Sequence, residues 1–205
     1  MSPRNHPSAD ILAAYAGGAL EPGFGLVVGA HLDYCPGCRR KVGAFEASSG
    51  AALDALPPAA LAADALERVM AKLDAPPEPA PRAERRTLLD RLPLKKKRWV
   101  IPGLWVAAVD TPHAPDNRVY LLGAAPGALT GQHTHGGAEF CTVLKGAFSD
   151  KTGHYTLGDF AAGDEDLDHQ PKVEGDEECI CLFATEGRLK AHGLLAQLAF
   201  RYADV

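Results

Sequence analysis

The segment from His31 to Cys38, which reads His-Leu-Asp-Tyr-Cys-Pro-Gly-Cys, constrains the fold of this chain more than any other feature. His31 and Cys35 are four residues apart, so on a helix they lie one turn apart on the same face. Pro36 favours the first turn of a following helix, which would place Cys38 in that turn. Three ligands of the kinds that Zn²⁺ prefers are therefore expected at one helix–helix corner.

A tetrahedral zinc site needs a fourth ligand. His6 is the only other histidine or cysteine before His113, and an N-terminal segment can fold back to supply it. The alternative is that Cys35 and Cys38 are small buried side chains beside a surface histidine. The helical spacing of His31 ahead of the two cysteines favours the metal site over that alternative.

Length, charge and cysteine usage limit the class of protein. The chain has 205 residues, of which 46% are hydrophobic, enough for two modest domains with buried cores. Its net charge of −5 gives no overall signature of nucleic-acid binding. The polar N-terminus does not resemble a signal peptide, and no apolar run approaches the roughly 18 residues of a membrane span. We therefore expect a cytoplasmic protein without a membrane partner, in which five cysteines stay reduced.

Residues 1–75 are predicted to form a small helical domain. Ser8 can cap a first helix that ends at Gly17, Glu21-Pro22 can open a second, and Pro36 a third. The second contains three glycines (Gly23, Gly25 and Gly29) and needs packing or a metal to hold it. A fourth helix is expected over residues 59–73, with one apolar stripe that means either core or a docking surface. That stripe consists of Leu66, Val69, Met70 and Leu73.

Residues 76–98 are predicted to be a linker. Four prolines between Pro76 and Pro81 favour an extended, semi-rigid spacer. From Arg82 to Arg98 there are eight basic residues against two acidic ones. Such a run is most often a solvated face, and docking to an acidic protein or to nucleic acid is the alternative.

Residues 99–205 change to the pattern of an all-β sandwich or barrel. Short apolar or alternating runs are separated mainly by Pro, Gly, Asp and Asn. The runs cover residues 99–109, 118–123, 138–144, 147–149, 179–184 and 194–200.

A second group of potential metal ligands lies in this β region. His133 and His135 are two residues apart, so on a strand both point to one face, and Glu139 shares their parity. With His169 they would supply three imidazoles and a carboxylate, a set that suits Zn²⁺, Fe²⁺ or Mn²⁺. Exposed loop histidines are the alternative, which three ligands within seven residues make less attractive.

Three cysteines in the β region are candidates for redox sensing. Cys179 and Cys181 lie on one face of a strand, where a spacing of about 6.6 Å disfavours a direct disulfide. Cys141 shares the parity of the predicted metal face. Burial as small hydrophobic side chains is the default interpretation, and oxidation near a metal is the alternative.

The β region resembles the cupin superfamily. The residues that match its first motif in spacing are Gly127, His133, His135, Glu139 and Gly146. Gly158 and His169 match the second motif in spacing, whereas Asp164 and Asp166 stand where cupins typically have Pro and Gly. The resemblance implies a double-stranded β-helix, or jelly-roll barrel.

The whole chain resembles the ChrR family of anti-sigma factors, in which a zinc-binding anti-sigma domain is followed by a cupin. The resemblance implies an α+β multidomain protein that sequesters an extracytoplasmic-function sigma factor and releases it on an oxidative signal such as singlet oxygen. It also implies no direct nucleic-acid contact. The residues that would hold the first zinc are His6, His31, Cys35 and Cys38, and those that would hold zinc or another divalent metal in the cupin are His133, His135, Glu139 and His169.

Two functions of different class remain open from the sequence. The first is this binding regulator, which needs no catalysis. The second is a metal-dependent cupin dioxygenase or isomerase whose helical domain serves for docking. The acidic residues in the second motif, and the absence of evident substrate-binding arginines near the histidines, favour the regulator.

Overall fold

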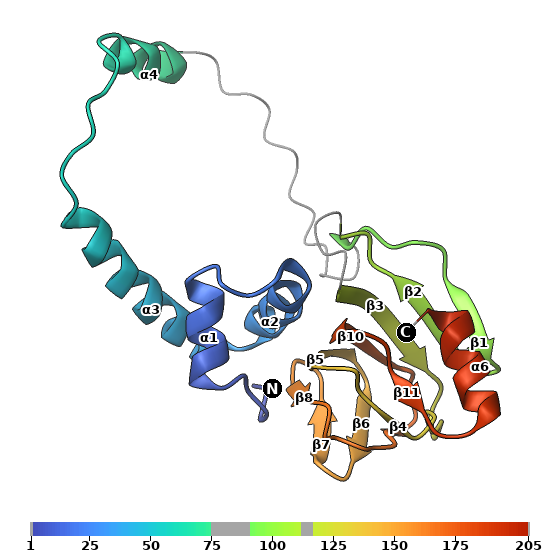
Figure 1. Cartoon of the computed structure of the whole chain (residues 1–205). Helices are drawn as coiled ribbons and strands as arrows, with labels where there is room; N and C mark the ends of the chain where they lie inside the picture. The colour runs from blue at the N-terminus through green and yellow to red at the C-terminus, as the bar shows by residue number, and fades with distance from the viewer. Residues whose placement is uncertain (1, 75–90, 112–116, 205) are drawn as a thin grey trace.

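The N-terminal helices begin and end where the capping residues indicate. The computed structural model describes residues 2–74, 91–111 and 117–204 (Figure 1). The Ser8 hydroxyl accepts a hydrogen bond from the amide of Ile11 at 3.3 Å, and Pro22 and Pro36 each stand in the first turn of a helix. The first three helices are α1 (Ala9–Ala16), α2 (Pro22–Tyr34) and α3 (Pro36–Asp54).

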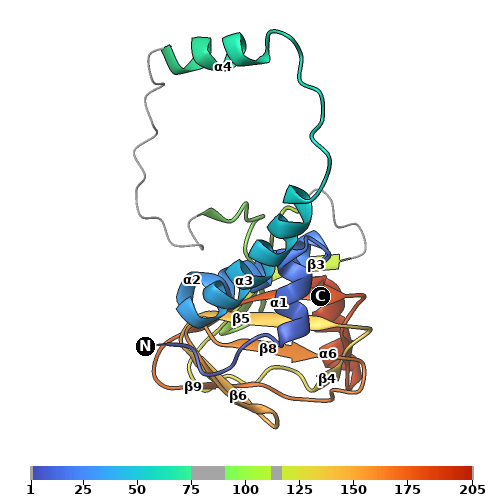
Figure 2. The same ribbon diagram turned by 90° about the vertical axis from the view of Figure 1, so that its left-hand side faces the viewer.

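The fourth helix, α4 (Ala65–Asp74), is shorter than the predicted residues 59–73, and the predicted start was wrong. Pro57 and Pro58 disfavour helix just upstream, and Asp64 is a good capping residue immediately before Ala65. The helix stands apart from the rest of the described chain in both views (Figures 1 and 2). Its apolar stripe is exposed, so the interpretation of that stripe as core was wrong.

The predicted all-β region is confirmed as two packed antiparallel sheets. The larger has the order β1 (Arg98–Ile101), β2 (Leu104–Ala108), β3 (Asn117–Ala124), β10 (Cys179–Glu186), β5 (Glu139–Lys145) and β8 (Phe160–Gly163). The smaller has the order β7 (Gly153–Thr156), β6 (Ala147–Asp150) and β9 (Lys172–Glu174). A further antiparallel pair joins β11 (Lys190–Ala191) to β4 (His133–Thr134).

The last segment is a helix, α6 (Leu194–Ala203), so the strand predicted over residues 194–200 was wrong. The segment is rich in Leu and Ala, which favour helix, and lacks the β-branched residues that favour strands. The guanidinium of Arg98 donates to the carbonyl of Ala203 at 2.7 Å and so ties the end of α6 to β1. The packing of α6 beside β1 is visible in Figure 1.

Helix α2 packs directly on the larger sheet (Figure 2). Its buried side chains, among them Val27 and Val28, share one hydrophobic core with residues of β3, β5 and β10. A Cβ added to Gly23 would lie 2.6 Å from Cγ2 of Val119, so this glycine lets the helix approach the sheet. The Thr142 hydroxyl of β5 donates to the carbonyl of Val27 at 2.9 Å. Packing thus supports the glycine-rich helix, as predicted.

The proposed division into residues 1–75, 76–98 and 99–205 stays a prediction. The proline-rich part of the linker and much of its basic run fall in residues 75–90, outside the described residues. Within the described ranges, no helix combines the length and apolar character needed to cross a membrane.

Two candidate metal centres

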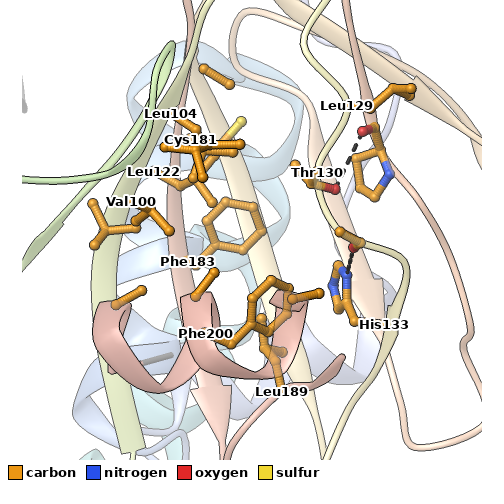
Figure 3. Close-up of a pocket in the computed structure, with 18 of the residues that line it drawn as sticks. Val100, Leu104, Leu122, Leu129, Thr130, His133, Cys181, Phe183, Leu189 and Phe200 are labelled. Atoms are coloured by element: carbon orange, nitrogen blue, oxygen red, sulfur yellow. Dashed lines mark hydrogen bonds between the residues drawn. The ribbon is translucent and has the colours of Figure 1, made fainter. Parts of the chain in front are cut away.

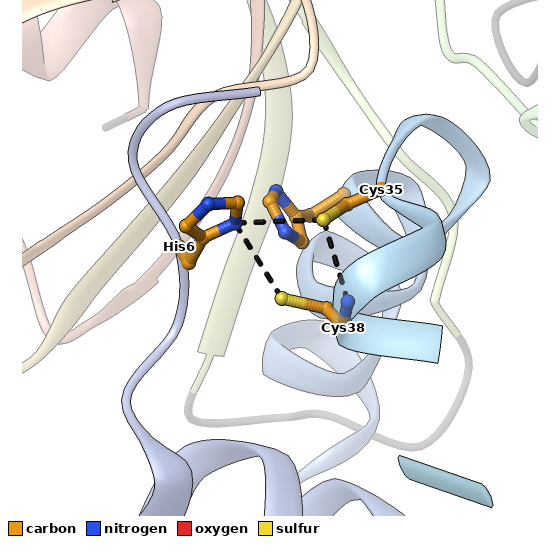
Figure 4. Close-up of side chains that lie close together, drawn as sticks. His6, Cys35 and Cys38 are labelled. Carbon is orange, nitrogen blue, oxygen red and sulfur yellow. Dashed lines mark hydrogen bonds between the residues drawn. The ribbon is translucent and has the colours of Figure 1, made fainter. Parts of the chain in front are cut away.

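The first centre is the predicted cluster of His6, His31, Cys35 and Cys38. One potential ligand atom from each residue lies within 4.8 Å of the others. The sulfur atoms of Cys35 and Cys38 are each 3.5 Å from Nδ1 of His6 (Figure 4). His31 is fully buried, which excludes the alternative of a surface histidine beside two buried cysteines. The structure thus brings all four predicted residues together.

The hydrogen bonding and pKa values of His31 and Cys38 favour the binding of a cation at this centre. The ring of His31 donates through Nδ1 to the carbonyl of Gly158 at 2.7 Å, whereas its buried Nε2 has no hydrogen-bond partner within residues 2–74, 91–111 and 117–204. Such an outer hydrogen bond orients an imidazole for metal binding. Burial lowers the pKa of His31, which favours the neutral ring that a metal needs. Burial and the neighbouring Cys35 raise the pKa of Cys38 to about 11, so ionisation of this thiol calls for a bound cation.

Asp159, in the turn between β7 and β8, holds the N-terminal segment that carries His6. Oδ1 of Asp159 accepts from the amides of Arg4 at 2.5 Å and Asn5 at 2.8 Å. Oδ2 accepts from the amide of Thr156 at 2.8 Å and from its hydroxyl at 2.9 Å. Burial opposes ionisation of Asp159, but these bonds hold its pKa below the usual range. The N-terminal segment is therefore docked on the β domain.

The second centre is the predicted cluster of His133, His135, Glu139 and His169. All four side chains are buried, and one potential ligand atom from each lies within 4.8 Å of the others. His133 and His169 face each other in an isolated antiparallel bridge, with their Nε2 atoms 3.1 Å apart. Burial excludes the alternative of exposed loop histidines.

Each histidine of the second centre has an outer hydrogen bond through Nδ1 that leaves Nε2 turned inward. His133 donates to the carbonyl of Gly131 at 2.7 Å, and His135 donates to the carbonyl of Asp164 at 3.1 Å. His169 lies 2.6 Å from Oδ2 of Asp150. Three imidazoles in this arrangement are oriented for one metal ion.

The electrostatics of the second centre also fit a cation. Burial opposes ionisation of Asp150, but His169 and Thr152 hold its pKa down to about 2. Burial lowers the pKa of His133 and keeps that ring neutral. Nε2 of His135 lies 3.3 Å from Oε1 of Glu139, and Oε2 of Glu139 is buried with no hydrogen-bond partner in the part of the chain that the structure describes. A cation held among these atoms would satisfy that oxygen.

Three functional contacts could not be recognised in the sequence: the carboxylates of Asp150 and Asp159 and the carbonyl of Gly158. Each supports a ligand that is distant in the sequence, and neither carboxylate belongs to a motif. The glycine of the second cupin motif does occur at Gly158, where φ is +83° and a Cβ would meet the ring of Tyr34. Its position in a motif was thus the only available signal.

The three cysteines of the β domain are buried inside the sandwich. The sulfur atoms of Cys179 and Cys181 are 3.7 Å apart, and all five cysteines are free thiols. Burial raises the pKa of Cys141, and the sulfur contact with Cys141 raises that of Cys181. These thiols are therefore protonated at rest, and their redox role stays a prediction.

Comparisons with known proteins identify the family of this chain. The family described as the ChrR cupin-like domain matches residues 94–189. Anti-sigma-E factor ChrR of Cereibacter sphaeroides is 37% identical over 206 residues, which cover 97% of this chain and 97% of the relative. The solved structure of Rhodobacter sphaeroides SigE in complex with the anti-sigma ChrR matches with a TM-score of 0.75 and 38% identity, over 89% of this chain and 99% of that one. The predicted fold, helices followed by a cupin, is confirmed, and the chain belongs to the ChrR family of anti-sigma factors.

Proposed function

We propose that this protein binds an extracytoplasmic-function sigma factor in the cytoplasm, keeps it from RNA polymerase, and releases it when its cupin domain receives an oxidative signal. The relative that matches over 97% of this chain is named an anti-sigma-E factor, and a similar chain was solved in complex with SigE. That full-length similarity also argues against the alternative of a cupin enzyme. The function proposed is sequestration, without catalysis.

The observation that carries this proposal is the exposed apolar stripe of α4. Leu66, Val69, Met70 and Leu73 are between 49% and 73% exposed. They recur at the spacing of one helical face, the pattern of a helix that lies in an apolar groove of a partner. Leu53, in the last turn of α3, and Leu56, two residues beyond the helix, are exposed apolar side chains as well. An exposed apolar surface of this kind is typical of a site that binds another protein.

Zinc is the metal we propose for the first centre. Two thiolates and two imidazoles form a tetrahedral set that zinc prefers, and four protein ligands leave no position for water. The second centre offers three imidazoles and one carboxylate, again four ligands, which suits zinc or another divalent ion. When bound there, a metal would cross-link β4, β5 and the chain around His169. With zinc bound, four protein ligands form a closed tetrahedral set, which supports sensing rather than turnover.

Strand β5 supplies a direct path from the second centre to the helices. Glu139, at its start, belongs to the metal cluster on the inner face, whereas Thr142 donates to Val27 of α2 from the outer face. The β7–β8 turn supplies another contact, because Gly158 and Asp159 hold His31 and the segment carrying His6. A change at the cupin metal would therefore reach the first zinc through contacting residues.

The test compares two aspartate substitutions on opposite faces of α4. Val69→Asp places a charge in the apolar stripe, and Ala71→Asp places the same charge on the other face. The variants would be mixed with purified candidate sigma factors, and binding measured by calorimetry. We expect Val69→Asp to abolish binding and Ala71→Asp to preserve it, with unchanged melting of both variants. Equal binding by both would contradict the role of α4.

A further inference from the structure

A cavity of about 280 Å³ lies inside the β sandwich, beside the second metal centre (Figure 3). Its walls are side chains of β1, β2, β3 and β10 on one side and the segment around Leu129 and Thr130 on the other. Val100, Leu104, Leu122 and Phe183 are among them, so most of the surface is apolar. The cavity is separate from the zinc cluster of the helices and from the sigma-binding surface proposed above.

Polar groups gather at one end of the cavity. His133, Glu139 and His169 line it there, and Tyr120 contributes a hydroxyl to the same lining. The hydroxyl of a tyrosine can donate a hydrogen bond to a head group at this end of the cavity. The cavity thus combines a long apolar wall with a polar end.

Helix α6 closes the cavity with small side chains. Ala196 and Ala199 of α6 face the space, and Phe200 packs on His133 with ring centroids 5.5 Å apart. Leucines at these two alanine positions would occupy the cavity, whereas alanines leave it open. The bond from Arg98 to the carbonyl of Ala203 holds this helix against β1. The space is therefore built into the packing of α6 on the sheet.

We propose that this cavity binds a small, mainly hydrocarbon molecule with one oxygen-bearing head group, the head turned toward Tyr120 and the second metal centre. A dry apolar cavity of about 150 Å³ takes one benzene molecule, so one nearly twice that size takes roughly a dozen carbon atoms. A chain of about ten carbons matches this capacity. Apolar pockets with a few convergent polar groups are typical of small-molecule sites.

Occupancy of the cavity would act on the strands that carry the regulatory contacts. Cys181 of β10 and Glu139 of β5 both line the cavity, and the outer faces of these strands support α2. The ligand is then a second input to the sigma factor release proposed above, and this part of the inference rests on that function. The binding itself does not depend on it.

Calorimetry of the full-length, zinc-loaded protein with decanoic acid and with 1-decanol tests the inference. The two probes share a chain of the predicted size and differ in the charge of the head group. We expect saturable binding of at least one probe at one site per chain. The absence of saturable binding by either probe would overturn the proposal.

Two phenylalanine substitutions on α6 locate the site. Ala199→Phe fills the cavity. Leu198→Phe is the control, because Leu198 is 62% exposed and does not line the cavity. We expect at least a tenfold loss of affinity for Ala199→Phe and none for Leu198→Phe. If Ala199→Phe fails to fold, Leu122→Phe on the opposite wall replaces it, with the same expectation. Undiminished binding by a folded cavity-filling variant would overturn the proposal, whether or not the protein binds a sigma factor.

Discussion

Replacing Asp159 with Asn should detach the N-terminal segment from the β domain and weaken the first zinc site. The carboxylate accepts two hydrogen bonds on each oxygen, from Arg4 and Asn5 on one and from Thr156 on the other. An amide group keeps one oxygen and presents an NH₂ in place of the other, so two of the four bonds are lost. The bonds to Thr156 join residues three apart in one turn and re-form easily. We therefore expect the bonds to the distant N-terminal segment to be the ones that break.

The size of the effect follows from the strength of these bonds. A hydrogen bond to a charged acceptor contributes about 1.5–3 kcal/mol, so the loss of two costs on the order of 3 kcal/mol or more. Since about 1.4 kcal/mol corresponds to a factor of ten, metal affinity at a site that needs His6 should fall roughly 100-fold. This agrees with the roughly 10–100-fold effect of removing an outer partner of a metal ligand.

Cobalt binding to the first centre can be measured separately from the second. Only the first cluster contains thiols, so absorption from sulfur-to-cobalt charge transfer reports that site alone. Competition between cobalt and a chelator gives the affinity of the wild-type protein, of Asp159→Asn and of Asp176→Asn, an exposed control. Unchanged affinity in Asp159→Asn would show that Asp159 does not position His6 for metal binding.

Other parts of the structure give further tests. Asp150→Ala removes the acceptor of His169 and should lower metal affinity of the second site roughly 10–100-fold, as measured by metal retention during dialysis against a chelator. Gly23→Ala should destabilise the protein by about 1–3 kcal/mol in urea unfolding, because its Cβ would meet Val119, whereas Gly25→Ala, in open space, should stabilise it by up to about 1 kcal/mol. The reverse order of the two alanine variants would contradict the packing of α2. Chelation of the first zinc should release the N-terminal segment but preserve most of the far-UV circular dichroism, since α2 shares its core with the sheet; loss of most helical signal would show that the metal alone holds the helix.

Local patterns predicted the clusters of ligands well. His31, Cys35 and Cys38 follow helical spacing across a proline-opened turn, so their convergence needs no distant contact. His133, His135 and Glu139 follow the alternation of strands in the same way. His169 and His6 were named through the cupin spacing and by elimination, because what positions them is distant in the sequence.

The long-range contacts could not be read from spacing. Asp159 binds amides that are 155 and 154 residues away, and no local pattern marks a carboxylate for that role. The packing of α2 on the sheet likewise depends on the absence of a Cβ at Gly23, which would otherwise clash with Val119. The segment at 194–200 was misassigned because its apolar run was interpreted by hydrophobicity alone. Its Leu and Ala content and its lack of β-branched residues favour the helix that the structure has.

Transcription in a purified system tests sequestration and release directly. RNA polymerase would transcribe a promoter that depends on a cognate extracytoplasmic-function sigma factor, with and without the full-length protein. We expect stoichiometric protein to stop transcription and treatment with singlet oxygen to restore it. We expect the same inhibition but no restoration for Glu139→Ala, which removes a ligand of the second centre. Transcription that continues undiminished in the presence of the zinc-loaded protein, with every candidate sigma factor tested, would show that the protein is not an anti-sigma factor.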